Sequence, residues 1–472
     1  MNTGDKSTLI RDNAIQADKP FQSLLEKQFS YFMSPLETFI HKQTTSGILL
    51  VIFSIVAFAL SNSPWKEFLE NVGDVPLGII IDRWDFSLSI KDWISQGLMT
   101  LFFFLTGLEL KREILAGKLT DIKEISLVCA AAFGGIVIPA LFYYSMNKDG
   151  IGQHGWAIPT ATDTAFAIAI LALFARRISI GLTIFLTALA IFDDIGAIVI
   201  ISIFYAHETN STALIASGLI FACLLFGNKA GIRNGWIYAV MGILLWLSVL
   251  QAGIHPTLSG LLLAMTIPAR TTISQSRFIK NIRGLLTRFE QKQEDDISML
   301  GSSGKHSLVS DIEQNVLAAS TPLQRWEMGL IIPIAIIILP LFALFNAGFP
   351  ITQEIIIKGL SSSVTIGIIF GLVVGKPIGI LLFSYVAIRS GLGRLPYGVR
   401  FKDVIGVSML AGIGFTMSVF FTTLSFPDHE ELAELAKLGI LIGSLMSAML
   451  GSIWIYTQFP NLYLRKNKEK AL

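Results

Sequence analysis

The sequence has 472 residues, of which 53% are hydrophobic and only 15% are charged. Soluble domains usually carry more charge, so the composition favours a chain whose apolar surface meets lipid. The net charge of +2 argues against nucleic-acid binding, and Cys129 and Cys223 lack the spacing of a disulfide framework or a metal site.

Apolar runs long enough to cross a bilayer recur along the chain. A hydrocarbon core of about 30 Å needs roughly 20 helical residues, and we predict an all-α polytopic membrane protein with 12 transmembrane helices. The stretch 235–268 would measure about 50 Å as one helix, so Gly253, His255 and Pro256 are predicted to form a turn. The predicted spans cover residues 45–62, 92–108, 124–146, 156–174, 180–204, 212–226, 235–252, 256–268, 327–347, 360–388, 403–425 and 436–457.

The segments outside the spans predict the orientation. Residues 1–44 form a polar N-terminal extension without the pattern of a cleaved signal peptide, 45–457 form the membrane domain, and 458–472 form a tail. Twelve spans place both termini on one side, and most of the 36 Lys and Arg residues lie in segments on that side. By the positive-inside rule, both termini are expected in the cytoplasm.

Two segments between spans are predicted to stay outside the membrane. Residues 269–326 are polar and mixed in charge, which indicates a long cytoplasmic loop that is partly disordered. Residues 75–90 alternate in polarity around a turn near Asp82, which predicts an external β-hairpin. The free edge of this hairpin could pair with that of a second copy, giving a homodimer.

Four charged side chains stand out because they lie deep inside predicted spans: Asp163 in the fourth, Asp193 and Asp194 in the fifth, and Lys376 in the tenth. A charge in the apolar interior costs at least about 2.5 kcal/mol. At 1.5 Å per residue, all four lie about 16–18 Å deep, near the middle of the bilayer. A structural ion-pair cluster is the alternative, but charged groups at this depth usually serve a function.

The two adjacent aspartates predict a division of roles. Neighbouring residues of a helix point about 100° apart, so Asp193 and Asp194 cannot face the same partner. We expect one carboxylate to pair with Lys376 and the other to face Asp163 and an open cavity. The second carboxylate can hold a proton or a Na+ ion, but not both, so Na+ uptake requires proton release.

The backbone of two spans is predicted to be interrupted. Span four has Pro159 and Thr162 near its middle, and span eleven has Gly412 and Gly414, which weaken helical hydrogen bonding or helix propensity. We predict that both helices are discontinuous, although a continuous span eleven packed through its glycines is an open alternative. Spans four and eleven run in opposite directions, so spans three to five and ten to twelve are predicted to form an inverted-topology repeat.

Spans four and five, GWAIPTATDTAFAIAILALF and LTALAIFDDIGAIVIISIFY, carry motifs by which the chain resembles NhaA-type Na+/H+ antiporters. The resemblance continues through FFFLTGLELKREIL, QAGIHPTLSGLLLA, ILPLFALFNAG, GKPIGILLFSYVAIR and LAGIGFTMSVFFTTLSF. It covers residues 45–457 apart from 269–320, and AIFDDIGA together with TATD is a highly specific combination.

The resemblance implies a secondary active antiporter that exports Na+ or Li+ in exchange for H+, without a cofactor, in a bacterial inner membrane. Exchange would be electrogenic and pH-regulated, and would serve sodium and pH homeostasis. The resemblance also implies that Asp194 binds the cation and the proton, with Asp163 as a second transient Na+ ligand. Asp193 would pair with Lys376, while Thr162 supports the site together with Asp163.

Further charges at the cytoplasmic mouth match family positions linked to pH activation and cation access. These residues are Glu109, Arg112, Glu113 and Glu327. Without the resemblance, they would be ordinary flanks of membrane helices. His255 also matches a family histidine, although a role in its turn explains it equally well. Near Glu327 the family often carries two histidines, whereas this chain has Met328 and Ile331, so pH sensing must use other groups.

Two other classes of function fit less well. A membrane enzyme could use an Asp pair to bind Mg2+ and a diphosphate or to hydrolyse a bond. However, DDIGA lacks a further acidic ligand, and no nucleophile with a His partner lies at the same depth. A proton-coupled carrier of an organic solute would need a wider polar cavity than a few carboxylates, one amine and small residues provide.

Overall fold

The computed structural model of the chain describes residues 43–81, 84–116, 121–175, 177–205, 209–291 and 303–458. Nearly all of the predicted N-terminal extension and of the predicted tail lies outside the described residues. Helices dominate the described part, which also contains one two-stranded sheet. In chain order its α-helices and strands are α3 (Gln43–Ser61), α4 (Lys66–Gly73), β1 (Pro76–Ile81), β2 (Trp84–Ser89), α5 (Ile90–Asp92), α6 (Met99–Ala116), α7 (Ile122–Met146), α8 (Thr164–Leu173), α9 (Ile180–Phe204), α10 (Ser211–Lys229), α11 (Gly235–Gln251), α12 (Thr257–Thr266), α13 (Gln275–Gln291), α14 (Ser303–Ala319), α15 (Pro322–Pro333), α16 (Leu339–Asn346), α17 (Gln353–Ser361), α18 (Ser363–Phe370), α19 (Lys376–Arg389), α20 (Phe401–Leu410), α21 (Phe415–Ser425) and α22 (Glu430–Gln458).

Several helical segments continue through short turns of another helix type. Segments of π-helix join α5 to α6 (Trp93–Leu98), α15 to α16 (Ile334–Ile338) and α18 to α19 (Gly371–Gly375). A 3-10 helix, Ile151–Thr160, precedes α8. The three π-helical joins keep their segments continuous, so Ile90–Leu115, Pro322–Asn346 and Ser363–Arg389 each form one helical segment.

Within the described residues, 8 helical segments are long and apolar enough to cross a membrane, or up to 10 if each of two bent pairs counts as one span. The bent pairs are α3 with α4, at 111°, and α20 with α21, at 52°. Helices α11 and α12 are apolar but shorter. The prediction of an all-α polytopic membrane protein is therefore confirmed.

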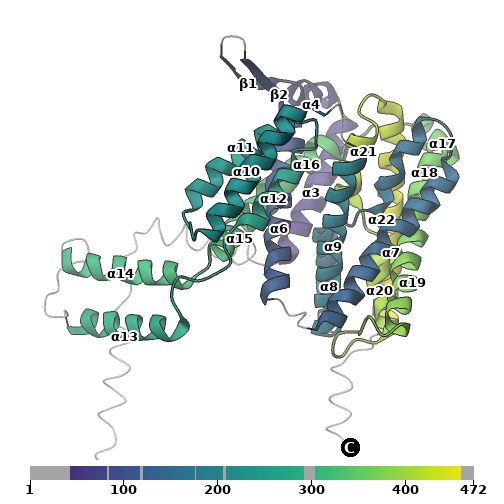
Figure 1. Cartoon of the computed structure of the whole chain (residues 1–472). Coiled ribbons are helices and arrows are strands. Elements are labelled where there is room, and N and C mark those ends of the chain that lie inside the picture. The colour runs from purple at the N-terminus through teal and green to yellow at the C-terminus, as the bar shows by residue number, and fades with distance from the viewer. Residues whose placement is uncertain are drawn as a thin grey trace, which may run out of the picture.

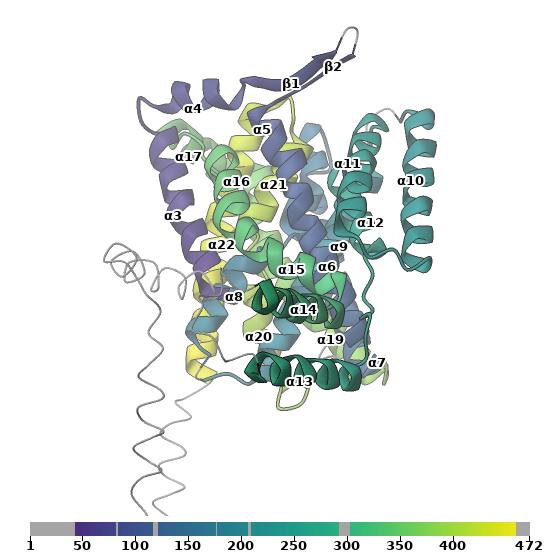
Figure 2. The same ribbon diagram turned by 90° about the vertical axis from the view of Figure 1, so that its left-hand side faces the viewer.

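One end of the bundle carries the sheet and helix α4, and we call it the hairpin end (Figure 1). Strands β1 and β2 pair antiparallel, in a register running from Pro76 opposite Ser89 to Ile81 opposite Trp84. The β-hairpin predicted from alternating polarity is confirmed. Figure 2 shows α4 lying across the bundle at the same end, as its sharp bend from α3 requires.

The polar segment between α12 and α15 differs from its prediction as an irregular loop. Helices α13 and α14 pack against each other and project sideways from the bundle, toward the end opposite the hairpin (Figure 1). Phe278, Ile282 and Leu285 of α13 recur at helical spacing and are shielded from solvent, as is Leu308 of α14. A narrow apolar stripe is enough for two helices to pack against each other. Such a stripe contributes few apolar residues, so the overall composition of the segment stays polar and the helical period was overlooked.

Helix α9 runs through two separate hydrophobic cores. Its first half, with Leu182, contributes to a core shared with α7, α19 and α20, and its second half, with Ile198, to a core shared with α6, α16 and α21. Asp193 and Asp194 lie in α9 between these two sets of residues. The bundle therefore places its paired acids at the junction of its two main cores.

The fourth predicted span is helical only in parts. Its 3-10 helix ends at Thr160, Ala161 is extended, and α8 begins after Asp163. The backbone N–H of Asp163 donates to the carbonyl oxygen of Ile413 at 2.6 Å, in the short break between α20 and α21. The two interruptions therefore lie against each other. Gly412, in the same break, lies close to the segment between α18 and α19, because a Cβ there would lie 2.4 Å from the Leu372 carbonyl oxygen.

Helices α7 and α19 cross in close contact beside these interruptions. A Cβ atom added at Gly379 would lie 2.0 Å from the carbonyl oxygen of Gly134, and one at Gly134 would lie 2.3 Å from that of Gly379. Backbone atoms cannot rotate away as flexible side chains can. The crossing distance is therefore set by the absence of two side chains.

We predict that Gly379→Ala destabilises the protein by about 1–3 kcal/mol, because its methyl group forces α7 and α19 apart. The measurement is the melting temperature of the detergent-solubilised protein. Gly218→Ala in α10 is the matched control, since a Cβ there has no neighbour within 4 Å. Equal melting temperatures for the two variants would show that the crossing is not tightly packed.

Candidate functional site

The four charged residues predicted inside the spans lie deep within the bundle. Asp163, Asp193 and Asp194 are at most 3% exposed, and Lys376 is fully buried. The Lys376 Nζ atom lies 3.1 Å from Asp193 Oδ2, so α19 and α9 are joined by an ion pair. We call these four residues the acidic cluster.

Asp193 is the carboxylate that pairs with the amine. Its Oδ2 atom also lies 2.7 Å from Thr162 Oγ1, whereas its Oδ1 atom is buried without a hydrogen-bond partner in the described structure. Lys376 donates a second hydrogen bond to the Thr160 carbonyl oxygen, at the end of the 3-10 helix. The amine thus serves both an acid and a free carbonyl at the interruption, where the helix ends with partial negative charge.

Asp163 is held by neutral donors from two helix N-termini. Its Oδ1 atom accepts the backbone N–H of Phe166 in α8 at 3.1 Å. Its Oδ2 atom accepts the backbone N–H of Thr416 in α21 at 3.0 Å, together with the Thr416 hydroxyl. Because helix N-termini carry partial positive charge, one carboxylate stabilises both broken ends. The sequence analysis missed Thr416, although its position directly after the Gly412–Gly414 break was a usable signal.

Of the three acids, Asp194 has the fewest groups that could stabilise its negative charge. Its contact with a hydrogen-bond donor is the Thr164 hydroxyl, at 3.3 Å from Oδ2. It is buried beside Asp193 and within electrostatic range of Asp163. A buried carboxylate with so few donors is costly in its bare ionised form, so it gains most from taking up a proton or a cation.

The charges predicted at the cytoplasmic mouth form two groups. Arg112 of α6 makes an ion pair with Glu327 of α15, and Glu109 lies within electrostatic range of both. Glu113, one turn further along α6, instead lines a small hollow shared with α7 and α9, beside Phe192. This hollow approaches α9 next to the paired aspartates.

His255, the fifth residue for which the resemblance implies a role in pH sensing or cation entry, lies apart from these four mouth residues. It sits in the turn before α12, where its Nδ1 atom lies 2.8 Å from Thr257 Oγ1, and its ring packs edge-on against Phe420 at 5.3 Å. It lines a cavity at the hairpin end of the bundle. A role of His255 in pH sensing or cation entry therefore stays a prediction.

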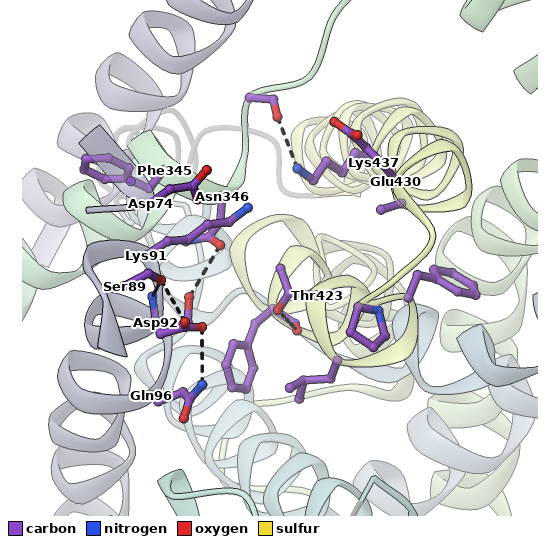
Figure 3. A pocket seen from close by; sticks show the side chains of 18 of the residues that line it. Asp74, Ser89, Lys91, Asp92, Gln96, Phe345, Asn346, Thr423, Glu430 and Lys437 are labelled. Carbon is purple, nitrogen blue, oxygen red and sulfur yellow. Dashed lines mark hydrogen bonds between the residues drawn. The ribbon is translucent and has the colours of Figure 1, made fainter. Parts of the chain in front are cut away.

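The cavity lined by His255 has a volume of about 800 Å³, and we call it the vestibule. Figure 3 shows Lys91 and Asp92 on one wall and Lys437 on another, contributed by α22. Phe420 belongs to its lining and packs on the fully buried Phe103 and Phe342. The charged side chains of the lining are Lys66, Glu70, Asp74, Lys91, Asp92, Glu430, Glu434 and Lys437.

Ionisable side chains buried among membrane helices, together with a polar cavity at one end of the bundle, are typical of an ion-coupled membrane transporter. The chain matches the family described as Na+/H+ antiporter 1 over residues 37–455. It is 42% identical to a Na(+)/H(+) antiporter NhaA 1 of Saccharophagus degradans, over 91% of this chain and 93% of that relative. It is also 41% identical to a Na(+)/H(+) antiporter NhaA of Syntrophobacter fumaroxidans, over 98% of both chains.

The chain therefore belongs to the Na+/H+ antiporter 1 family. Family membership makes it a secondary transporter of Na+ and H+ rather than an enzyme, as the sequence predicted. The resemblance inferred from the aspartate motifs is confirmed, and so is the multi-pass membrane location.

We predict that Lys376→Met destabilises the protein by about 3–5 kcal/mol, because it leaves Asp193 as a buried charge without its cation. Adding Asp193→Asn should recover a large part of this loss, since the two residues share one interaction. The melting temperatures of the single and double variants measure the coupling. Strictly additive losses would show that the ion pair contributes nothing to stability.

Proposed function

We propose that this chain exports Na+ or Li+ in exchange for H+, and that Asp194 carries either ion in turn. The observation that supports this role is the contrast among the three acids. Asp193 has an amine partner and Asp163 accepts three hydrogen bonds, whereas Asp194 has one long contact to a hydroxyl. An acid in that situation binds a proton or a hard cation through its oxygens.

Competition at Asp194 couples the two flows. Na+ is cargo here and can bind only after the proton has left, and a proton returning from the other side displaces it. The Thr164 hydroxyl, 3.3 Å from Asp194 Oδ2, could supply a further oxygen atom, and Asp163 lies within electrostatic range. Three aspartates and one lysine leave two net negative charges when all are ionised, so full neutralisation takes two protons. Competition at Asp194 exchanges one of these protons for one Na+, so electrogenic exchange, with more H+ than Na+ per cycle, requires another acid of the cluster to carry the second proton.

The proposed transport path uses both ends of the bundle. We assign the hairpin end to the outer side of a bacterial inner membrane, with the vestibule as the outer aqueous approach and both termini in the cytoplasm. We assign the inner approach to the opposite end of the bundle, where α6 carries Glu109 and Arg112. Twelve spans, two of them discontinuous, would form an inverted repeat around the crossing of Asp163 with Ile413. Such repeats expose one site alternately to each side.

We predict that Asp194→Asn abolishes Na+-driven proton movement while the protein still inserts and folds, because an amide can neither release a proton nor neutralise Na+. The measurement is the recovery of the fluorescence of a pH-sensitive dye in proteoliposomes that hold an imposed proton gradient, after Na+ is added.

Asp311→Asn is the matched control for this test, because it makes the same change on exposed helix α14. Its exchange rate should equal that of the unsubstituted protein. Full exchange by Asp194→Asn would refute the assignment of the carrier residue. Recovery of the dye fluorescence on addition of an organic solute, but not of Na+, would refute the assignment of the cargo.

We also propose that Glu109, Arg112 and Glu327 set the pH at which exchange begins. They link α6 to α15, and Met328 and Ile331 of α15 are exposed apolar residues that cannot titrate. Arg112→Gln should shift the pH of half-maximal exchange by about half a unit or more, because it removes the cation that favours ionised carboxylates. The dye assay scanned over pH measures this, and an unchanged profile would refute the role.

We further propose a homodimer formed through the free edges of the hairpin. Strands β1 and β2 pair only with each other in the described structure, so an edge is available to a second copy. The mass of the detergent-solubilised protein, with and without residues 76–89, decides this point.

A further inference from the structure

A hydroxyl group of helix α22 accepts hydrogen bonds from the broken end of α21. The Ser444 Oγ atom accepts the backbone N–H groups of Gly414 and Phe415, each at 3.3 Å. Ser444 is only 5% exposed, so water does not readily take its place. The first N–H groups of a helix have no partner within the helix and need an acceptor when they are buried.

Ser444 and Asp163 divide the first turn of α21 between them. Ser444 accepts from Gly414 and Phe415, and the next amide, that of Thr416, donates to Asp163. These three amides are consecutive on one rigid turn. The position of the Thr416 donor relative to the Asp163 carboxylate therefore depends on where Ser444 holds the preceding two amides.

Helix α22 itself packs closely on its neighbours through glycine residues. Added Cβ atoms would lie 2.9 Å from the Thr365 carbonyl oxygen at Gly439, 3.1 Å from Leu372 at Gly443, and 2.6 Å from Leu410 at Gly451. These small residues recur at multiples of four along one face, so α22 packs closely on α18, α20 and the segment between α18 and α19. Ser444 is thus presented from a fixed support.

We propose that Ser444 is a positioning residue for the cation site: it fixes the N-terminus of α21, and through it the contact of Thr416 with Asp163. The proposal rests on the proposed function, since it concerns the same site. It assigns a role in ion binding to α22, which contributes no charge to the acidic cluster.

Ser447 provides a matched control within the same helix. It lies one turn beyond Ser444, is 1% exposed, and also faces the break, because a Cβ added at Gly412 would lie 2.6 Å from its hydroxyl oxygen. Its hydroxyl group has no hydrogen-bond partner in the described structure. Removing it tests burial and packing at this place without removing a hydrogen bond to α21.

The experiment compares Na+ dependence in proteoliposomes for Ser444→Ala, Ser447→Ala and the unsubstituted protein. Ser444→Ala should raise the KM for Na+ about fivefold with Vmax changed by less than about twofold, because two buried amides lose their acceptor and the site loosens. Ser447→Ala should change neither value by more than about twofold. Ser444→Thr, which keeps the hydroxyl group, should restore the KM.

Equal KM values for Ser444→Ala and Ser447→Ala, or a loss of Vmax alone, would overturn the proposal. If Ser444→Ala cannot be purified folded, Ser444→Cys replaces it, because a thiol is a weaker acceptor and should give an intermediate KM. A KM for Ser444→Cys equal to that of the unsubstituted protein would then refute the role. Absence of Na+-dependent exchange by the unsubstituted protein would refute the proposed function and this inference together.

Discussion

The contact between Asp163 and the two helix ends that it caps is the interaction on which the rest of the site depends. Breaking a helix inside a membrane bundle leaves amides and carbonyls without partners, where no lipid atom can replace them. Here one carboxylate accepts from α8 and α21, and one amine donates to the Thr160 carbonyl oxygen. The charged side chains thus satisfy the free amides and carbonyls of the broken helices. The same backbone groups stabilise the buried charges.

The three aspartates are chemically identical, but different groups stabilise their negative charges. Asp193 has a cation, Asp163 has amides and a hydroxyl group, and Asp194 has one distant hydroxyl. Asp193 and Asp194 are adjacent in the sequence, and the helical rotation between them turns one toward α19 and the other toward α8. A small geometric difference thereby separates a carboxylate with a buried cation partner from a carboxylate with one weak donor.

Helix α21 connects this cluster to the vestibule. Thr416 bonds to Asp163, and Phe420 lies one turn further along the same helix, where it forms part of the vestibule lining against Phe103 and Phe342. Because the helix is continuous between these residues, a displacement of its N-terminus also displaces the aromatic floor.

The class of protein, the hairpin and the four buried charges could be predicted from the sequence alone. Hydropathy and the cost of a charge in lipid are properties of individual residues, so they can be read without knowing the fold. Only the tertiary structure revealed Thr416 and Ser444 at the site, the vestibule, the place of His255 at its wall, and the pairing of α13 with α14. The Asp163 carboxylate and the Thr416 amide are 253 positions apart. Contacts of that range follow from how helices cross, and neither polarity nor periodicity along the chain encodes the crossing.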